Sequence, residues 1–375
     1  TPCWTYQPWP HNLNQTVSGK PGAVHSAAAR TTLEAAGYAF LEDTPVALAG
    51  ATLSKLQVPQ GTSLDAARQQ ITQLDPAALV DLNHYYRPEK AETSTCSGAD
   101  CPMRQIVGWP DAGLAGSTCG TPSRIGLVDT AINTDHAVFA GRRIETIRLG
   151  GETQPASGRQ HGTAVAALLV GAQGGRAPGL LPDADLVAVD AFYDASRAGD
   201  RAEAFDLVRA LDLLALRRVD VVNMSLAGPD NQLLKRAVTL VSERNIVIVA
   251  AAGNAGPKAA PLYPAAYEPV IAVTAVDRAK RPYRRAGQGD HIDIAAPGVN
   301  VWTAASISGA RQKTGTSFAA PFVTAAVALL KAGDPAMTAT QIMDSLVASA
   351  EDLGEPGKDP VFGHGLLDAR ALCRA

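Results

Sequence analysis

From about residue 124 onward, short aliphatic runs alternate with longer segments whose apolar residues recur at helical spacing. The aliphatic runs are uniformly apolar, as is typical of strands that are covered on both faces. The segments between them, at 202–217 and 233–244, have apolar residues three or four positions apart. This alternation predicts an α/β fold, a doubly wound and mostly parallel sheet flanked by helices. The expected strands are 125–128, 186–189, 219–222, 246–252 and 270–276.

A second, smaller pattern precedes the sheet. Two segments have the composition and spacing of helices, and either Thr62 or Ser63 can cap the second of them. Short strand-like stretches lie between and after the two helices. This arrangement predicts a small α+β unit. The expected helices are 26–36 and 62–74, and the expected strands are 37–41, 52–58 and 79–86.

The remaining segments have no regular pattern. Residues 1–24 contain four Pro and two Trp without periodicity, so we expect an N-terminal tail. Residues 88–120 are rich in Gly, Ser, Thr and Pro, which is typical of a linker. The predicted organisation is a tail at 1–24, a small α+β unit at 25–87, a cysteine-containing linker at 88–120 and an α/β domain at 121–375.

Composition narrows the classes of function. The 375 residues are 46% hydrophobic and 18% charged, which suits a large buried core and excludes a disordered chain. The net charge of −3 provides no electrostatic footprint for nucleic acid or for an anionic membrane. No apolar run reaches the roughly 18 residues that a spanning helix needs, so we expect no transmembrane segment.

The cysteines bear on the compartment. Three of the five lie within 24 residues of the linker, which favours a local disulfide and an oxidising, extracytoplasmic location, secreted or periplasmic. Reduced thiols in a cytosolic protein are the alternative. No cysteine pair has zinc-ligand spacing, so we expect no metal. Because Thr1 is not an initiator Met, we expect that a signal peptide precedes this numbering. The cysteines are Cys3, Cys96, Cys101, Cys119 and Cys373.

Four segments place a polar group at a predicted strand end or helix start. Asp129 ends an aliphatic strand, His161 opens an apolar helical run, and Asn254 follows a buried strand between two glycines. Ser317 lies in Gly-Thr-Ser-Phe-Ala-Ala-Pro just before another apolar run, where the backbone N–H groups of a helix start favour negative charge. Taken singly, each is better explained as a cap or a structural side chain than as a reacting group.

The order of these residues discriminates among serine hydrolases. Asp129, His161 and Ser317 follow one another as Asp, His, Ser, each at the edge of the same predicted sheet. An α/β-hydrolase has G-x-S-x-G and the order Ser, Asp, His, whereas a chymotrypsin-like protein has His first in a β-rich chain. Neither pattern fits this chain.

Residues 121–375 closely resemble the subtilisin-like serine peptidases, the subtilase family. Seven segments carry the resemblance in the family's order, and an eighth, Phe362-Gly-His-Gly-Leu, follows near the end of the chain. The seven are Val128-Asp-Thr130, His161-Gly-Thr163, Asn223-Met-Ser-Leu226, Ala252-Gly-Asn254, Tyr263-Pro264, Ala296-Pro-Gly298 and Gly315-Thr-Ser-Phe-Ala-Ala-Pro321.

The resemblance implies acyl transfer through a covalent intermediate. In the family's scheme Ser317 is the nucleophile, His161 the general base and acid, and Asp129 the residue that orients the imidazole. Asn254 would donate its side-chain amide to the oxyanion. No cofactor is implied, and the Tyr263–Pro264 bond is expected to be cis. The residues implied in binding the substrate backbone are Ser225, Leu226, Ala227, Gly228, Ala252 and Gly253.

Several positions depart from the family's usual residues. Ala131 and Ala227 stand where Gly is common, Ala164 and Phe322 where His is common, and Phe318 where Met is common. None of these changes removes a reacting group, so activity is expected, with an altered substrate preference through the narrower wall at Ala227. The stretch 169–186 is short where relatives carry a calcium-binding loop, and we expect no metal there.

The unit at 25–87 is similar in layout to the inhibitory prodomain of these enzymes, and its last residues, Tyr85-Tyr86-Arg87, are followed by Pro88. The resemblance implies a proenzyme whose partners are protein or peptide substrates and its own N-terminal unit in cis, with no nucleic acid. Processing is expected in the linker before Cys96, leaving a linker disulfide, Cys101–Cys119 or Cys96–Cys101, on the mature enzyme. An unrelated accessory domain is the alternative for the unit. A triad-based peptide ligase or cyclase, or a binding module with the prodomain permanently bound, are the alternatives for function.

Overall fold

The computed structural model describes residues 14–19, 27–88, 103–109, 123–151, 154–196, 199–370 and 372. All five cysteines lie outside these residues, and so do the expected disulfide and processing site. The rest of the expected tail, apart from 14–19, is also outside them.

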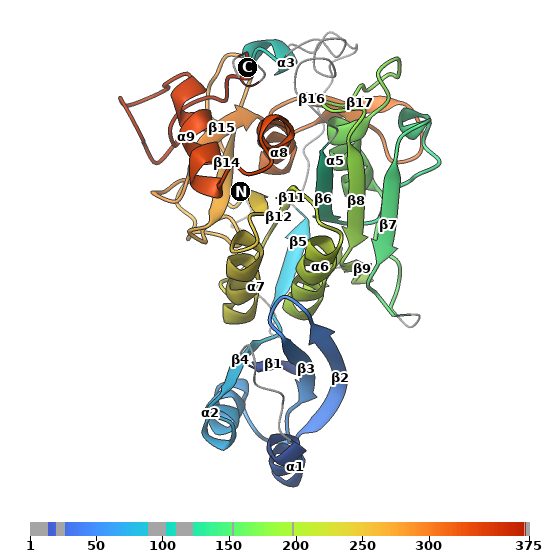
Figure 1. Ribbon diagram of the computed structural model, residues 1–375, viewed down its shortest axis with the longest axis vertical. Helices are drawn as coiled ribbons and strands as arrows, with labels where there is room; N and C mark the ends of the chain where they lie inside the picture. Colours follow the sequence, from blue (N-terminus) through green and yellow to red (C-terminus); the bar gives the residue numbers. More distant parts are fainter. Residues whose placement is uncertain are drawn as a thin grey trace, which may run out of the picture.

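A seven-stranded parallel sheet forms the centre of the larger unit (Figure 1). Its strand order is β15-β14-β13-β11-β6-β8-β7. β6 comes first in the chain, and later strands are added on both of its sides, as in a doubly wound sheet. The predicted α/β architecture is confirmed. The strands are β6 Arg124–Asp129, β7 Ile144–Arg148, β8 Asp185–Asp190, β11 Val221–Met224, β13 Val247–Ala251, β14 Val270–Val276 and β15 Ile294–Pro297.

Helices cover both faces of this sheet and divide the core into two layers. One layer contains the buried residues of α5 Gln160–Val170, α8 Thr316–Gly333 and α9 Ala339–Ser349. The other contains those of α6 Ala204–Leu216 and α7 Gln232–Ser242. A hairpin of β16 Val301–Ala304 and β17 Ala310–Lys313 leads into α8. Of the described helices, α8 alone is long and apolar enough to span a membrane, but 83% of its apolar window is buried, as in a core helix.

The smaller unit has its own antiparallel sheet and core. Its sheet has the order β2-β3-β1-β4, and Ser63 caps α2 by accepting a hydrogen bond from Ala66 N at 3.2 Å. Leu33, Leu56 and Ile71 are fully buried between sheet and helices. The elements are β1 Asn14–Gly19, α1 Ala27–Ala35, β2 Ala39–Val46, β3 Ala51–Gln57, α2 Leu64–Leu74 and β4 Ala78–Leu82.

One prediction for this unit is wrong. Residues 14–19 were expected to belong to the tail, but as β1 they pair with both β3 and β4 inside the sheet.

The predicted strand at 79–86 is in fact two strands. It is broken at Asn83–His84, and its second half, β5 Tyr85–Pro88, leaves the small unit for a different sheet. The break has a local cause, because the Asn83 side chain donates to Glu203 Oε2 (2.7 Å) and accepts from Phe205 N (3.0 Å). These bonds attach the chain to the larger unit at the point where it leaves the smaller one.

The sheet that β5 joins is antiparallel and connects the two units. Its order is β12-β5-β10-β9, with β9 Phe192–Asp194, β10 Asp200–Glu203 and β12 Leu226–Ala227 all contributed by the larger unit. Figure 1 shows β5 running up from the small unit between α6 and α7 toward the middle of the large one. Because residues 200–203 form β10, the helix predicted from 202 begins at Ala204.

Part of the predicted linker belongs to the core of the larger unit. Residues 103–109 form the short helix α3 Met103–Ile106 and a turn, and Met103, Val107 and Trp109 are buried in the layer under α8. Trp109 Nε1 donates to Leu180 O (3.2 Å), and Val107 O accepts from Ala369 N (2.7 Å). The linker prediction is therefore wrong for 103–109.

Candidate active site

Asp129 and His161 form a close pair at the carboxyl edge of the parallel sheet. Asp129 is the last residue of β6 and is 2% exposed, and His161 lies in the first turn of α5. His161 Nδ1 is 2.7 Å from Asp129 Oδ1 and 3.0 Å from Oδ2. Gly162 lets α5 approach this edge closely, because an added Cβ would lie 2.2 Å from Thr130 O. Thr130 Oγ1 also accepts from Gly162 N at 3.0 Å, which fixes the helix to the strand end.

Ser317 occupies the second position of α8, and the residue after it packs near the same histidine. Gly315 precedes the helix with φ of 151°, a backbone angle that favours glycine, and this turn brings Ser317 to the helix start. The ring of the next residue, Phe318, lies 5.6 Å from the His161 ring between centroids. In this conformation Ser317 Oγ donates to Ser225 O (3.1 Å), and among the described residues His161 Nε2 is buried without a hydrogen-bond partner.

Asn254 is oriented by the residue that precedes the serine. Its Oδ1 accepts from Thr316 N (3.1 Å) and from Thr316 Oγ1 (3.2 Å). Thr316 Oγ1 also accepts from Gly253 N at 3.1 Å. These bonds direct Asn254 Oδ1 toward the start of α8, so Nδ2 is the side-chain atom that can donate a hydrogen bond.

The residues predicted to bind substrate backbone gather around one segment. Gly228 and Tyr263 exchange both backbone hydrogen bonds at 2.9 Å, which places Tyr263 beside the end of β12. Leu262 lies against Gly253, where an added Cβ would meet its Cδ1 at 2.6 Å. The structure thus brings Gly228 and Gly253, the last residues of the two predicted segments, into contact with residues 262–263. The Tyr263–Pro264 bond is cis, as predicted.

Between β10 and β12, the space is filled by β5. Arg87 pairs with Ala227, Pro88 with Leu226 and Tyr86 with Ala202, all antiparallel. The Tyr86 side chain is fully buried beside Gly228, where an added Cβ would lie 2.3 Å from the Tyr86 ring. Its hydroxyl donates to Pro229 O at 2.7 Å, and burial holds its pKa well above the usual range of a phenol.

Several polar residues at the site were given no role from the sequence, although Thr130 and Thr316 lie in segments that carry the family resemblance. Thr130 and Thr316 position the histidine helix and the asparagine, and Ser157 and Asp190 lie behind the Asp129 loop. Their contacts join segments that are far apart in the chain. No local pattern of residues indicates such contacts, so sequence reasoning had no signal for them.

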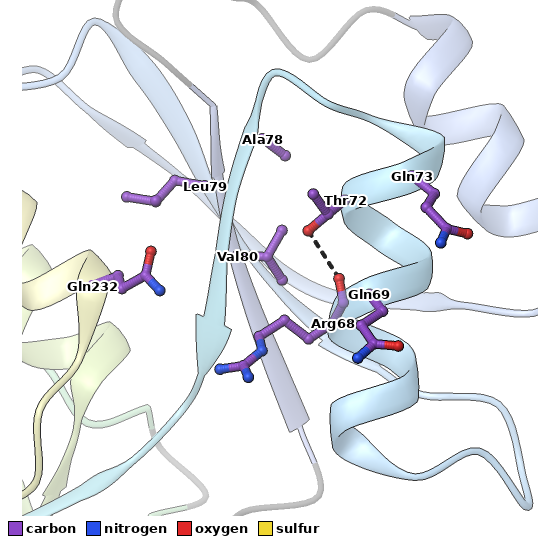
Figure 2. A pocket seen from close by; sticks show the side chains of 8 residues that line it. All are labelled: Arg68, Gln69, Thr72, Gln73, Ala78, Leu79, Val80 and Gln232. Carbon is purple, nitrogen blue, oxygen red and sulfur yellow. Dashed lines mark hydrogen bonds between the residues drawn. The ribbon is translucent and has the colours of Figure 1, made fainter.

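A separate cavity of about 540 Å³ lies between the two units (Figure 2). Arg68 and Thr72 of α2 line one side, β4 another, and Gln232 of α7 faces them. None of Asp129, His161, Asn254 or Ser317 borders it. Across the described ranges, no three His, Asp, Glu or Cys side chains are grouped as a metal site requires.

A family model described as the subtilase family matches residues 120–365 of the chain. Among curated relatives, the minor extracellular protease Epr of Bacillus subtilis is 32% identical over 72% of this chain and 40% of its own length. Subtilisin DY of Bacillus licheniformis is 32% identical over 68% of this chain and 92% of its own. An alkaline protease of Alkalihalobacillus alcalophilus is 31% identical over 80% and 76%.

Two solved structures of related proteases have a similar fold. Fervidolysin from Fervidobacterium pennivorans, described as a keratinolytic enzyme related to subtilisin, has a TM-score of 0.81 at 20% identity. The match covers 97% of this chain and 61% of fervidolysin, and it shows a shared fold. The prenylagaramide maturation protease PagA has a TM-score of 0.60 at 27% identity, covering 71% of this chain and 99% of PagA. The chain therefore belongs to the subtilase family and is a subtilisin-like serine peptidase.

Proposed function

We propose that the chain is a serine endopeptidase made as a proenzyme, in which Ser317, His161 and Asp129 form the triad and the N-terminal unit blocks the cleft in cis. The observation that carries the catalytic part is the pairing of His161 Nδ1 with the buried Asp129 at 2.7 Å, beside the helix start that presents Ser317. A buried carboxylate on one imidazole nitrogen leaves the other nitrogen to accept a proton.

The reaction begins with attack of Ser317 Oγ on the scissile carbonyl carbon. His161 Nε2 takes the hydroxyl proton, and Asp129 stabilises the imidazolium that forms. The negative charge moves to the carbonyl oxygen, where Asn254 Nδ2 and the backbone N–H groups at the start of α8 donate hydrogen bonds. His161 then gives its proton to the leaving amine. Water, activated by the same histidine, hydrolyses the acyl-enzyme and restores Ser317.

Substrate recognition would use the backbone. The edges of β12 and β10 can accept an extended peptide as an added antiparallel strand. In this scheme β12 residues Leu226 and Ala227 pair with the residues before the scissile bond, and Ser225 and Gly253 flank that bond. The two strands already hold β5 in that manner, with Pro88 opposite Leu226.

The occupied groove supports the inhibitory role of the N-terminal unit. Pro88 ends β5 beside Ser225, whose Oγ donates to the backbone O of Ser317 at 2.8 Å. The chain therefore passes into the candidate active site in an extended form. A peptide strand in this position excludes a second one, so an attached unit would keep the enzyme latent.

Contacts outside the groove attach the unit to the starts of two helices. Asp81 Oδ2 accepts from Gln232 N at 2.7 Å, which caps α7, and Asn83 Oδ1 accepts from Phe205 N, which caps α6. Lys55 forms an ion pair with the buried Glu203, and Leu48 N donates to Asp212 Oδ1 at 2.7 Å. Helix N-termini favour acceptors of this kind. These contacts explain how the unit is held over β10 and β12.

Processing and location complete the proposal. The enzyme would cut its own chain between Arg87 and Cys96, which frees the N-terminal unit, and would act outside the cytoplasm. The extracellular relatives support the location. Reducing and non-reducing gels of the processed protein, with mass mapping of the linker, test the cut. Release of the unit only after reduction would contradict it.

Labelling with a fluorophosphonate tests the catalytic part, with the wild type compared with Ser317→Ala and with N-terminal sequencing of processed bands. Labelling that depends on Ser317 is expected. A wild type that never labels would instead indicate a binding module with a permanently occupied cleft. The mass of the products separates hydrolysis from ligation, because hydrolysis adds water to the cleaved peptide and ligation does not.

A further inference from the structure

The chain that leads into the histidine helix is held by two carboxylates from elsewhere in the fold. Ser157 Oγ donates to Asp190 Oδ1 at 2.9 Å, and Gly158 N donates to Asp200 Oδ1 at 2.8 Å. These two residues precede His161 by only four and three positions. The N-cap residue of α5, Arg159, makes no side-chain cap of its own. The position of residues 157–158, which lead into the histidine helix, therefore depends on the hydrogen bonds that Asp190 and Asp200 accept.

Asp190 connects this approach to the loop after Asp129. It ends β8 and stands directly opposite Asp129 in the parallel register. Ser157 Oγ donates to Asp190 and also accepts from Ala131 N at 2.9 Å. One hydroxyl therefore joins the segment before His161 to the loop that follows Asp129. Phe192 N donates to the same Asp190 oxygen at 3.1 Å.

The charged surroundings of Asp190 are mixed. The pKa of its carboxyl is raised to about 6, mainly by burial and also by the charge of Asp129, against the opposing effects of the bonds from Ser157 and Phe192 N and of the charge of Arg148 on β7. Ionised Asp190 thus adds negative charge behind the pair of Asp129 and His161.

Asp200 connects the same approach to the strand that pairs with peptide. It begins β10, two residues before Ala202, which pairs with Tyr86 of β5. Gly158 fits closely against this carboxylate: an added Cβ would lie 2.7 Å from Asp200 Oδ2, so the Asp200 side chain would have to shift. Asp200 is thus the link between a strand of the substrate groove and the start of the histidine helix. Burial raises the pKa of its carboxyl, the charges of Asp194 and Asp129 raise it further, and that of His161 lowers it.

We propose that Asp190 and Asp200 are positioning residues that hold His161 for catalysis, and that Asp200 couples the seating of peptide on β10 to the placement of the histidine. This inference rests on the triad proposed above. Neither carboxylate contacts the reacting atoms. Both act through residues 157–158, and a displacement of the base by about 1 Å lowers turnover by up to about a hundredfold.

The test compares variants of the full chain, each activated as the wild type is and counted by fluorophosphonate labelling, so that rates are per active serine. Asp190→Ala and Asp200→Ala remove the acceptors. Asp190→Asn and Asp200→Asn keep Oδ1 as an acceptor and remove the charge. Asp194→Ala is the matched control, because Asp194 is exposed, pairs with Asp200 across β9 and β10, and accepts only from Ser196 N among the bonds described for its side chain.

Both alanine variants are expected to lower kcat about tenfold to a hundredfold, with KM changed less than about threefold. Asp200→Asn is expected to restore kcat to within about threefold of the wild type. Asp190→Asn should keep kcat at its plateau but make the acid limb of kcat/KM shallower, because the group that ionises near pH 6 is gone. If Asp190 and Asp200 only stabilised the fold, their alanine variants would have a lower melting temperature but unchanged kcat, KM and pH dependence of kcat/KM.

Two results would overturn the inference while leaving the triad intact. One is a labelled, active wild type whose alanine variants match Asp194→Ala. The other is a rise in KM at unchanged kcat for Asp200→Ala, which would limit that residue to binding peptide. A wild type that neither labels nor hydrolyses peptides would overturn the triad proposal and this inference together.

Discussion

Replacing Tyr86 by alanine should open the cleft. In a Ser317→Ala background, which cannot cut itself, β5 competes in cis with any added peptide for β10 and β12. The Tyr86 side chain is fully buried beside Gly228 and donates to Pro229 O at 2.7 Å. Truncating a buried aromatic ring costs about 3–5 kcal/mol, including about 1 kcal/mol for the lost hydrogen bond. The lower value corresponds to about a hundredfold change in the population with β5 displaced.

The assay is the binding of a fluorescein-labelled peptide with the sequence of residues 83–90, followed by anisotropy. The apparent Kd equals the intrinsic Kd divided by the fraction of molecules with an open groove. Tyr86→Ala should therefore lower the apparent Kd about a hundredfold, until the groove is fully open. Tyr86→Phe, which loses only the hydroxyl, should lower it about fivefold.

Leu41→Ala is the control, because Leu41 lies on the same unit and is 49% exposed. It should leave the apparent Kd unchanged. The N-terminal unit should keep its own fold in every variant, since Tyr86 packs in the core layer of α6 and α7 and not in the core of Leu33, Leu56 and Ile71. An apparent Kd that is the same for Tyr86→Ala and its parent would refute the idea that β5 closes the groove.

Three further outcomes are expected. Ser317→Ala should abolish peptidase activity with an unchanged melting temperature, and turnover near the wild-type level would reject Ser317 as the nucleophile. Asn254→Ala should lower kcat about 10²–10³-fold at similar KM, a magnitude taken from the equivalent change in subtilisin, and unchanged kcat with raised KM would contradict the oxyanion role. Burial raises the pKa of Asp206 to about 7, so between about pH 4 and about pH 7 the unfolded chain has released a proton that the folded chain keeps, and the free energy of unfolding falls as pH rises through this window. The full chain should lose stability over that window relative to Asp206→Asn, and parallel melting curves would exclude this effect.

The large sheet could be predicted because its strands carry their own signal. Residues 270–276 are buried throughout and form β14 with the predicted bounds, since a strand covered on both faces has to be apolar at every position. The catalytic candidates were found for a related reason. Asp129 and Asn254 interrupt such runs at the edge of the sheet where function is expected, and the order Asp, His, Ser narrowed the chemistry.

The short strands could not be predicted, because partners from distant parts of the chain create them. Asp200-Arg-Ala-Glu203 has no strand pattern and becomes β10 by pairing with β5 and β9. Asn14–Gly19 is mostly polar and is nevertheless the strand between β3 and β4. The 103–109 segment has four apolar residues among its seven, but the sequence around it is rich in Gly, Ser, Thr and Pro, and nothing local indicates that Val107 and Trp109 are buried against the peptidase core. In each case tertiary contacts outweigh local preference.

The burial of Met103, Val107 and Trp109 in the larger unit has a consequence for how inhibition would end. About 14 residues separate Pro88 from Met103, a tether of at most about 50 Å, with the N-terminal unit at one end and the core at the other. If the unit inhibits as proposed, such a tether would hold it at an effective concentration in the millimolar range, whatever the amount of enzyme. A single cut replaces that fixed local concentration by the concentration of free N-terminal unit in the surroundings. Activation would then depend on dilution, so a dispersed enzyme becomes active while a crowded one stays latent with every bond in the interface unchanged.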